Sequence, residues 1–299
     1  MQTPSRRSSV SHPLFPEVFV LNSGRLLRLA AATTVSFALV TTGATTAAIA
    51  RPVAAEMDGV GALAVDLNDP RKKDIAMQIV SSAENSSLDW KAQFGYIEDI
   101  GDGRGYTAGI IGFCSGTGDM LDLVEEYSRR NTNNVLKKYL PALRNVDGTD
   151  SHAGLDPNYT KDWKTAAKDS VFKASQEAER DRVYFNPAVS QAKSDGVRAL
   201  GQFAYYDAIV MHGDGSDSTS FRNIRKRALT NAKPPSQGGN ETTWLNAFLD
   251  ARVWAMKQEE AHSDTSRVDT AQRVFLRNGN LDLNTPLNWK VYGDSFSIS

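Results

Sequence analysis

The sequence predicts a mainly helical (α+β) protein with one small β-hairpin and two lobes around a cleft. Apolar residues recur at helical spacing through most of the chain after residue 56. Two short runs flank the glycine-rich segment 101–105, and such a pattern is typical of a hairpin. The stretch 203–211 is almost entirely apolar, as expected of a helix buried at the centre of a core.

The first 55 residues differ in composition from the remainder of the 299-residue chain. They carry five arginines and one acid, Glu17, and an uncharged run rich in Ala and Thr extends from residue 29 to 50. A basic flank, an apolar run and small residues at its end are the parts of a secretory signal. We therefore predict that residues 1–55 are a signal or pro-segment, that 56–299 form the folded domain, and that the protein is secreted and extracellular. A membrane anchor is the alternative, because the run is nearly long enough to span a bilayer.

Charge and cysteine content restrict the possible partners. Without residues 1–55 the chain has 29 basic and 34 acidic side chains, a net charge of -5. Nucleic-acid binding requires a basic surface, so we exclude it, whereas a cationic partner fits. The single cysteine, Cys114, cannot form a disulfide within the chain, and its apolar neighbours predict that it is buried. The four histidines lack metal-ligand spacing, so we expect no metal and no cofactor. We also expect the protein to be a monomer.

The helices can be placed from caps and spacing. The first is expected to begin at Asp69-Pro70, capped by Asn68 or Asp69, and to end near Glu84. The hairpin should occupy 94–112, and another helix should begin at Asp119. A loop-rich segment is expected at 131–160, and the tail 280–299 is expected to wrap the surface. Further helices are predicted over about 161–182, 186–211, 218–232, 240–261 and 268–277.

Two acids have the placement that glycosidic-bond hydrolysis requires. One carboxylic acid must protonate the leaving oxygen, and one carboxylate must activate water or attack carbon. Glu84 lies at a helix C-terminus beside apolar residues, where the helix dipole and desolvation both favour its neutral form. Asp102 lies in a glycine-rich turn that water can reach, which favours its charged form. Taken by itself, this pattern is more often that of two ordinary surface acids.

Six longer segments carry more than this pattern, namely 81–90, 96–107, 112–119, 179–185, 204–213 and 264–270. They closely resemble the actinobacterial chitosanases of glycoside hydrolase family 46, and the likeness extends from Leu67 to the C-terminus. The resemblance implies an endo-acting, inverting chitosanase with a lysozyme-like, two-lobed fold and its hairpin beside the cleft. Residues 56–299 would then be the catalytic domain and chitosan the substrate.

The resemblance also implies roles for individual residues. The proton donor falls on Glu84, the general base on Asp102 and a water-positioning threonine on Thr107. Acids and neighbours that bind the cationic sugar fall on Asp119 and, less distinctly, on Tyr96, Glu98, Asp99, Arg104 and Glu259. Plain surface charge is the alternative for this second group. Three tryptophans are candidates either for sugar platforms or for core packing: Trp90, Trp163 and Trp244.

An ion-pair network behind the acid is implied as well, on Asp207, Arg252 and Arg267. A nearby Arg267 would favour the charged form of Glu84, against its role as an acid, unless Asp207 neutralises the arginines. A purely structural ion pair is the alternative. Two rival functions also stay open at this point, a lysozyme-like muramidase and an inactive polysaccharide-binding protein. The acidic charge argues against the muramidase, and retention of Glu84, Asp102 and Thr107 argues against the inactive protein.

Overall fold

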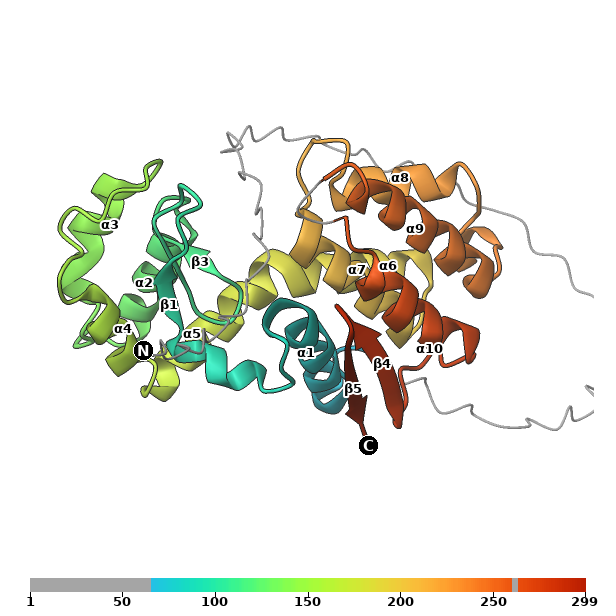
Figure 1. The fold of residues 1–299 in the computed structure, drawn as a ribbon, viewed down its shortest axis with the longest axis horizontal. Coiled ribbons are helices and arrows are strands. Elements are labelled where there is room, and N and C mark those ends of the chain that lie inside the picture. Colours follow the sequence, from blue (N-terminus) through green and yellow to red (C-terminus); the bar gives the residue numbers. More distant parts are fainter. Residues whose placement is uncertain (1–65, 260–262) are drawn as a thin grey trace, which may run out of the picture. The chain divides into compact units, whose positions relative to one another are not determined.

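The structure, a computed structural model, describes residues 66–259 and 263–299, and these residues are mainly helical, as predicted (Figure 1). The predicted signal segment lies outside the described residues. The α-helices are α1 (Pro70–Asn85), α2 (Asp119–Arg130), α3 (Leu140–Val146), α4 (Tyr159–Ala166), α5 (Ser170–Arg180), α6 (Asn186–Asp195), α7 (Ala199–His212), α8 (Phe221–Leu229), α9 (Glu241–Met256) and α10 (Arg273–Arg277).

Shorter helical turns link these helices. Three have 3-10 geometry, namely η1 (Trp90–Gly95), η2 (Lys137–Tyr139) and η4 (Pro235–Gln237). Two have the wider π geometry, namely η3 (Asp181–Phe185) and η6 (Arg267–Gln272). Such π turns inside helices are frequent at functional sites. Among the described residues, no helix combines the length and the apolar character needed to cross a bilayer.

Helix α1 carries the candidate acid and begins where its sequence predicts. The side chain of Asp69 accepts hydrogen bonds from the amides of Arg71 and Lys72, and Pro70 occupies the first turn. The helix ends at Ser86, whose left-handed backbone (φ 47°) stops the hydrogen-bonding pattern. Glu84 therefore lies in the last turn, as expected.

The predicted hairpin is part of a three-stranded antiparallel sheet. Its strands, β1 (Ile97–Asp99), β2 (Tyr106–Ala108) and β3 (Phe113–Cys114), are hydrogen-bonded in that order. The turn between β1 and β2 contains Asp102 and three glycines at 101, 103 and 105, all with positive φ. Only glycine adopts such angles without strain, so the glycine spacing sets the path of the turn.

Two separate hydrophobic clusters form the cores, which agrees with the two predicted lobes. One gathers side chains of α1, α6 to α10 and β4 (Leu287–Val291), and helix α7 is buried along nearly its whole length, as its apolar sequence predicts. The other gathers side chains of the three-stranded sheet and of α2 to α5. Trp90 packs against both clusters, so η1 is a point where they meet.

Several predicted boundaries were wrong, each for a local reason. The predicted helix 186–211 divides into α6 and α7 because Gly196 takes a left-handed C-cap (φ 76°). The predicted helix 161–182 divides into α4 and α5 because Asp169 caps a new helix by accepting from the amide of Val171. The segment expected to be loop-rich contains η2 and α3, and Pro141 occupies the first turn of α3.

The chain's last residues also differ from expectation. Instead of wrapping the surface irregularly, they form an antiparallel hairpin of β4 and β5 (Asp294–Ile298). Its turn is Tyr292-Gly293, with φ of 51° and 89°, as a tight two-residue hairpin requires. Residues 287, 289 and 291 of β4 are buried and alternate with exposed ones. This alternation was a strand signal that the prediction missed.

Candidate active site

Glu84, Thr107 and Arg104 line one pocket of about 340 Å³, together with side chains of both clusters. Glu84 comes from α1, Thr107 from β2 and Arg104 from the glycine-rich turn. The pocket therefore brings together residues that lie on different elements. Its aromatic and charged walls include Trp90, Tyr96, Arg180, Tyr184 and Tyr206.

The candidate acid is held by an arginine that is remote in sequence. The Glu84 side chain is 21% exposed, and its Oε1 accepts a hydrogen bond of 2.5 Å from Nη1 of Arg267. Arg267 is the first residue of the π turn η6, which follows α9 near the C-terminal end of the chain. A charge-assisted bond of this kind fixes the orientation of the carboxyl group.

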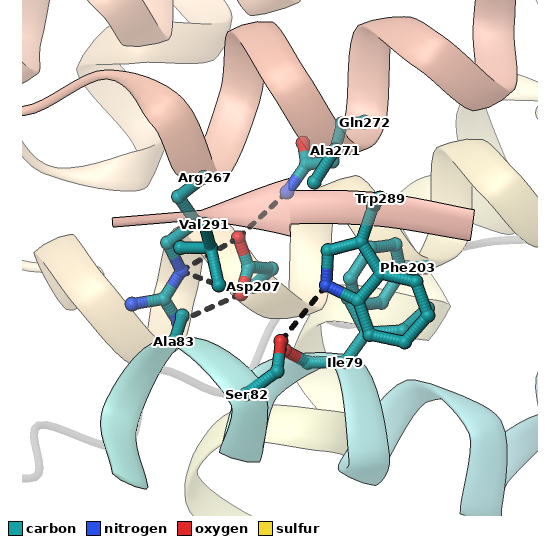
Figure 2. A pocket seen from close by; sticks show the side chains of 10 residues that line it. All are labelled: Ile79, Ser82, Ala83, Phe203, Asp207, Arg267, Ala271, Gln272, Trp289 and Val291. Atoms are coloured by element: carbon teal, nitrogen blue, oxygen red, sulfur yellow. Dashed lines mark hydrogen bonds and ion pairs between the residues drawn. The ribbon is translucent and has the colours of Figure 1, made fainter. Parts of the chain in front are cut away.

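The three residues of the predicted ion-pair network are brought together by the fold, and Figure 2 shows two of them, Asp207 and Arg267. Asp207, on α7, is 1% exposed. Its Oδ1 accepts from Nη2 of Arg267 at 2.7 Å, and its Oδ2 accepts from Nη1 of Arg252, on α9, at 2.6 Å. Burial acts to raise the pKa of Asp207, but the two guanidinium groups outweigh it and lower the pKa to about 2.

The charges of this network do not cancel within the network itself. Arg252 is fully buried and Arg267 is 5% exposed, so both positive charges are withdrawn from water. Asp207 carries one negative charge and therefore offsets only one of them. Glu84 is the second carboxyl group in direct contact with Arg267.

Gln272 is a member of this network that the sequence reasoning missed. Its Nε2 donates to Oδ2 of Asp207 at 2.6 Å, and Figure 2 shows it beside Arg267 above the same carboxylate. The two residues are five apart, and such a pair lies on one face only in a π turn, which η6 provides. Reasoning from an ordinary helical period places them on different faces, so no simple signal pointed to Gln272.

The candidate base is less accessible than its glycine-rich turn predicted. The Asp102 side chain is only 9% exposed, because the guanidinium group of Arg104 folds back over it. Oδ1 of Asp102 accepts from the amide of Arg104 at 3.1 Å, and Oδ2 accepts from its Nε at 2.7 Å and from its Nη2. Burial acts to lower the pKa of Arg104, but the bond to Asp102 and the nearby negative charges outweigh it, so the pKa is raised. Expecting an open, solvated Asp102 was therefore wrong, because the Arg104 side chain covers the carboxylate.

Thr107 lies at the centre of the sheet. It is buried, its neighbours across the strands are Glu98 and Cys114, and its Oγ1 is 3.4 Å from the Cys114 sulfur. Cys114 is buried, as predicted, and burial raises the pKa of its thiol to about 11. The thiol therefore stays protonated and unreactive at neutral pH.

Asp119 begins α2 and is fixed by three donors. Its Oδ1 accepts from the amides of Cys114 and Met120, each at 3.0 Å, and from the hydroxyl of Thr117 at 2.6 Å. Burial nevertheless raises the pKa of Asp119 to about 6. The carboxyl group therefore changes charge in mildly acidic solution, and this bears on any role in binding a cation.

The other predicted binding residues have different settings. Tyr96 lines the pocket, and its hydroxyl donates to Oε2 of Glu98 at 3.4 Å. Asp99 is used within the protein, because its Oδ1 accepts from the amide of Gly101 at 2.8 Å and its Oδ2 lies 3.1 Å from Nε2 of His152. Glu259 follows α9, where its amide donates to the carbonyl of residue 256 at 3.2 Å.

Two of the candidate tryptophans lie in the cores, and the third lines the pocket. Trp163 and Trp244 are fully buried and pack in the cores. Trp90 lines the pocket, where the guanidinium group of Arg180 lies 5.4 Å from its ring centre. Among residues 66–259 and 263–299, no group of three or more His, Cys, Asp or Glu side chains is arranged to hold a metal ion.

Comparison with known proteins decides the family. The model of "Glycosyl hydrolase family 46" matches residues 78–287. The chain belongs to this family. It is therefore a glycoside hydrolase, and the predicted lysozyme-like fold is confirmed.

Individual relatives in the family agree with this. The chain is 70% identical to the chitosanase of Streptomyces sp. (strain N174) over 233 residues, which cover 78% of this chain and 84% of that one. It is also 70% identical to the chitosanase of Nocardioides sp. (strain N106) over 236 residues, which cover 79% and 84%. A solved structure of chitosanase OU01 with substrate is 61% identical, covers 79% of this chain and 99% of that one, and superposes with a TM-score of 0.74.

The buried Asp207 predicts a dependence of stability on pH. Its pKa is about 2 in the folded protein and 3.8 ordinarily, so its stabilising contribution is complete above pH 4 and is lost as the pH falls from about 4 to 2. We expect the urea unfolding free energy to fall by roughly 2 kcal/mol in this interval from this group. Asp207→Asn should be about 3–5 kcal/mol less stable at pH 7, because it leaves buried arginine charge unpaired.

The variant's own pH profile distinguishes this cause from general acid unfolding. Asp207→Asn should lose the steep decline between pH 4 and 2. Asp214→Asn, which removes a partly exposed partner of Arg222, serves as the control and should keep it. An unchanged slope in Asp207→Asn would show that another carboxylate is responsible.

Proposed function

We propose that the protein is a secreted endo-chitosanase that hydrolyses β-1,4 glucosaminidic bonds with inversion, with Glu84 as general acid and Asp102 as general base. The observation that carries the proposal is the shared pocket, which is lined by Glu84, by Thr107 and by the arginine that holds Asp102. The 70% identity to two proteins named chitosanase supports the substrate.

The acid step uses the charge arrangement around Glu84. Glu84 gives its proton to the leaving glycosidic oxygen and is left as a carboxylate. Its contact with Arg267 then stabilises the developing negative charge, and the unbalanced positive charge of the network is offset at the same moment. In this step the positive charge of the network stabilises the transition state and the product carboxylate of Glu84, rather than its protonated resting form.

The base step takes place at the glycine-rich turn. Asp102, held in place by its bonds to Arg104, accepts a proton from water while that water attacks the anomeric carbon. The Thr107 hydroxyl, on the neighbouring strand, orients the water. Attack from the face opposite to the leaving group inverts the anomeric configuration.

The proposed substrate is cationic, and the chain is suited to it. The net charge of residues 56–299 is -5. Tyr96 lines the pocket and is hydrogen-bonded to Glu98, and Asp119 accepts from the amide of Cys114, which lies opposite Thr107 in the sheet. A muramidase acts on an anionic polymer, for which this charge is unfavourable. All proposed residues come from one chain, so we expect a monomer to be active without a cofactor.

Product analysis tests the reaction and its stereochemistry together. During hydrolysis of glucosamine oligomers followed by proton NMR, the α anomer should be formed first, because inversion converts a β linkage into an α product. Fully N-acetylated chitin oligomers should be poor substrates. Glu84→Gln and Asp102→Asn should each lose most of the turnover while remaining folded. A first-formed β anomer would instead mean retention and a different role for Asp102.

The proposed binding role of Asp119 predicts a pH-dependent affinity. Because its pKa is about 6, its negative charge is lost as the pH falls from 7 to 5, and the affinity for a glucosamine oligomer should weaken by about fivefold. The dissociation constant is to be measured calorimetrically on the Glu84→Gln protein. In the same background, Asp119→Asn has no carboxyl group to titrate at this position, so its affinity follows only the charge of the sugar amines. Its affinity should not weaken between pH 7 and 5. An identical pH profile for both proteins would remove Asp119 from the binding site.

Secretion follows from the N-terminal composition and is tested separately. When the full chain is expressed in an actinobacterial host, the protein collected from the medium should lack about the first 50–55 residues by intact mass. Protein that keeps its N-terminus and remains with the membrane fraction would support the anchor instead.

A further inference from the structure

The proposed base is carried by a very short sheet. Strands β1 and β2 pair over three residues each, and the last pair before the turn is Asp99 opposite Tyr106. A two-stranded ladder of this length is weak by itself, and its turn contains three glycines with wide conformational freedom. The position of Asp102 therefore depends on what holds this closing pair.

One side chain contacts both members of the closing pair. His152 lies in the segment 147–158 between α3 and α4, and its Nε2 is 3.1 Å from Oδ2 of Asp99. Its ring stacks on the ring of Tyr106 with centres 3.9 Å apart and planes 9° from parallel. The other oxygen of Asp99 accepts from the amide of Gly101, the first residue of the turn. A path of direct contacts thus runs from His152 to the turn.

The same segment contacts Tyr106 a second time, through a hydrogen bond. The Tyr106 hydroxyl donates to Oδ1 of Asp156 at 2.5 Å, and Oδ2 of Asp156 lies 3.7 Å from Nδ1 of His152. Burial and the bond to Asp156 raise the pKa of Tyr106 to about 12, so its hydroxyl remains a donor at neutral pH. The charged and titratable groups that face His152 are therefore Asp99 on β1, Tyr106 on β2 and Asp156 in its own segment.

The far end of the turn meets the same segment through the backbone. The amide of Gly116 donates to the carbonyl of Arg104, and the amide of Gly148 donates to the carbonyl of Gly116, both at 2.9 Å. A Cβ added at Gly116 would lie 2.0 Å from the carbonyl oxygen of Thr149, so the backbones are in close contact there. Segment 147–158 therefore braces the turn at its start and at its end.

We propose that His152 is a positioning residue for the general base, which acts by clamping the Asp99–Tyr106 pair that closes the Asp102 turn. This rests on the proposed function, in which Asp102 activates water. A base must be held within a fraction of an ångström of its working position, and misplacement by about 1 Å can cost on the order of 100-fold in rate. His152 contacts Asp99 and Tyr106, and Asp99 is bonded to the first residue of the turn, so the effect of His152 passes to Asp102 through the turn.

Two substitutions separate the contacts of His152. His152→Phe keeps a ring for Tyr106 but removes the nitrogen next to Asp99, and His152→Gln keeps a donor but removes the ring. Each should lower kcat at least about tenfold while KM stays within about twofold. Tyr127→Phe is the matched control, because it removes a hydroxyl hydrogen bond to a carboxylate, Asp169, in the same core and outside the turn. It should lower the melting temperature and leave kcat unchanged.

A second measurement does not depend on activity. Hydrogen exchange of the unliganded protein should be faster at the amides of 101 and 104 in both His152 variants, and unchanged there in Tyr127→Phe. Asp102→Asn, assayed beside them, tests the proposed function separately. If Asp102→Asn stays active while exchange changes as expected, the clamp exists but the base is misassigned.

Other outcomes overturn the proposal. Folded His152 variants with kcat within twofold of the parent would show that the clamp does not position the base. A rise in KM without a fall in kcat would place His152 in sugar binding instead. Unchanged exchange at 101 and 104 would show that the turn is held without His152.

Discussion

Asp207 is a carboxylate buried between two arginines, and it connects the elements that position the proposed acid, Glu84. It lies on α7, it accepts from Arg252 on α9 and from Arg267 and Gln272 on η6, and Arg267 continues to Glu84 on α1. Burying three charges is costly unless each has a partner with good geometry. The position of Glu84 is therefore tied to the packing of the whole larger core and not only to its own helix.

The two proposed catalytic carboxyl groups are supported in opposite ways. Glu84 stands at the end of a 16-residue capped helix and is backed by the buried network. Asp102 stands in a turn between strands of three residues and is held by its neighbour Arg104 and by the contacts of segment 147–158. The elements that carry Glu84 and Asp102 pack in different hydrophobic clusters. The distance between the two carboxyl groups is therefore set by how the clusters meet, and Trp90 is one of the side chains that contacts both clusters.

The electrostatics of the site are best understood as a change in charge during reaction. One carboxylate against two buried arginines leaves an excess of positive charge next to the acid. In the proposed mechanism, that excess stabilises the carboxylate that Glu84 becomes when it gives up its proton, which is the form that matters for lowering the barrier. The buried network is compatible with the proposed acid role in this sense.

The sequence by itself determined the features that neighbouring residues encode. The cap at Asp69, the glycines of the Asp102 turn and the apolar run of α7 act within a few residues, and each predicted its element correctly. The resemblance added the residues of the site, which spacing alone left as ordinary surface acids.

Tertiary structure decided the rest. Glu84 and Arg267 are 183 positions apart, and only packing brings them into contact. Gln272 joins the network because η6 widens into a π turn, and Asp102 is covered because Arg104 folds back over it. These features depend on long-range contacts and on a departure from regular helical period, and neither is written in the spacing of nearby residues.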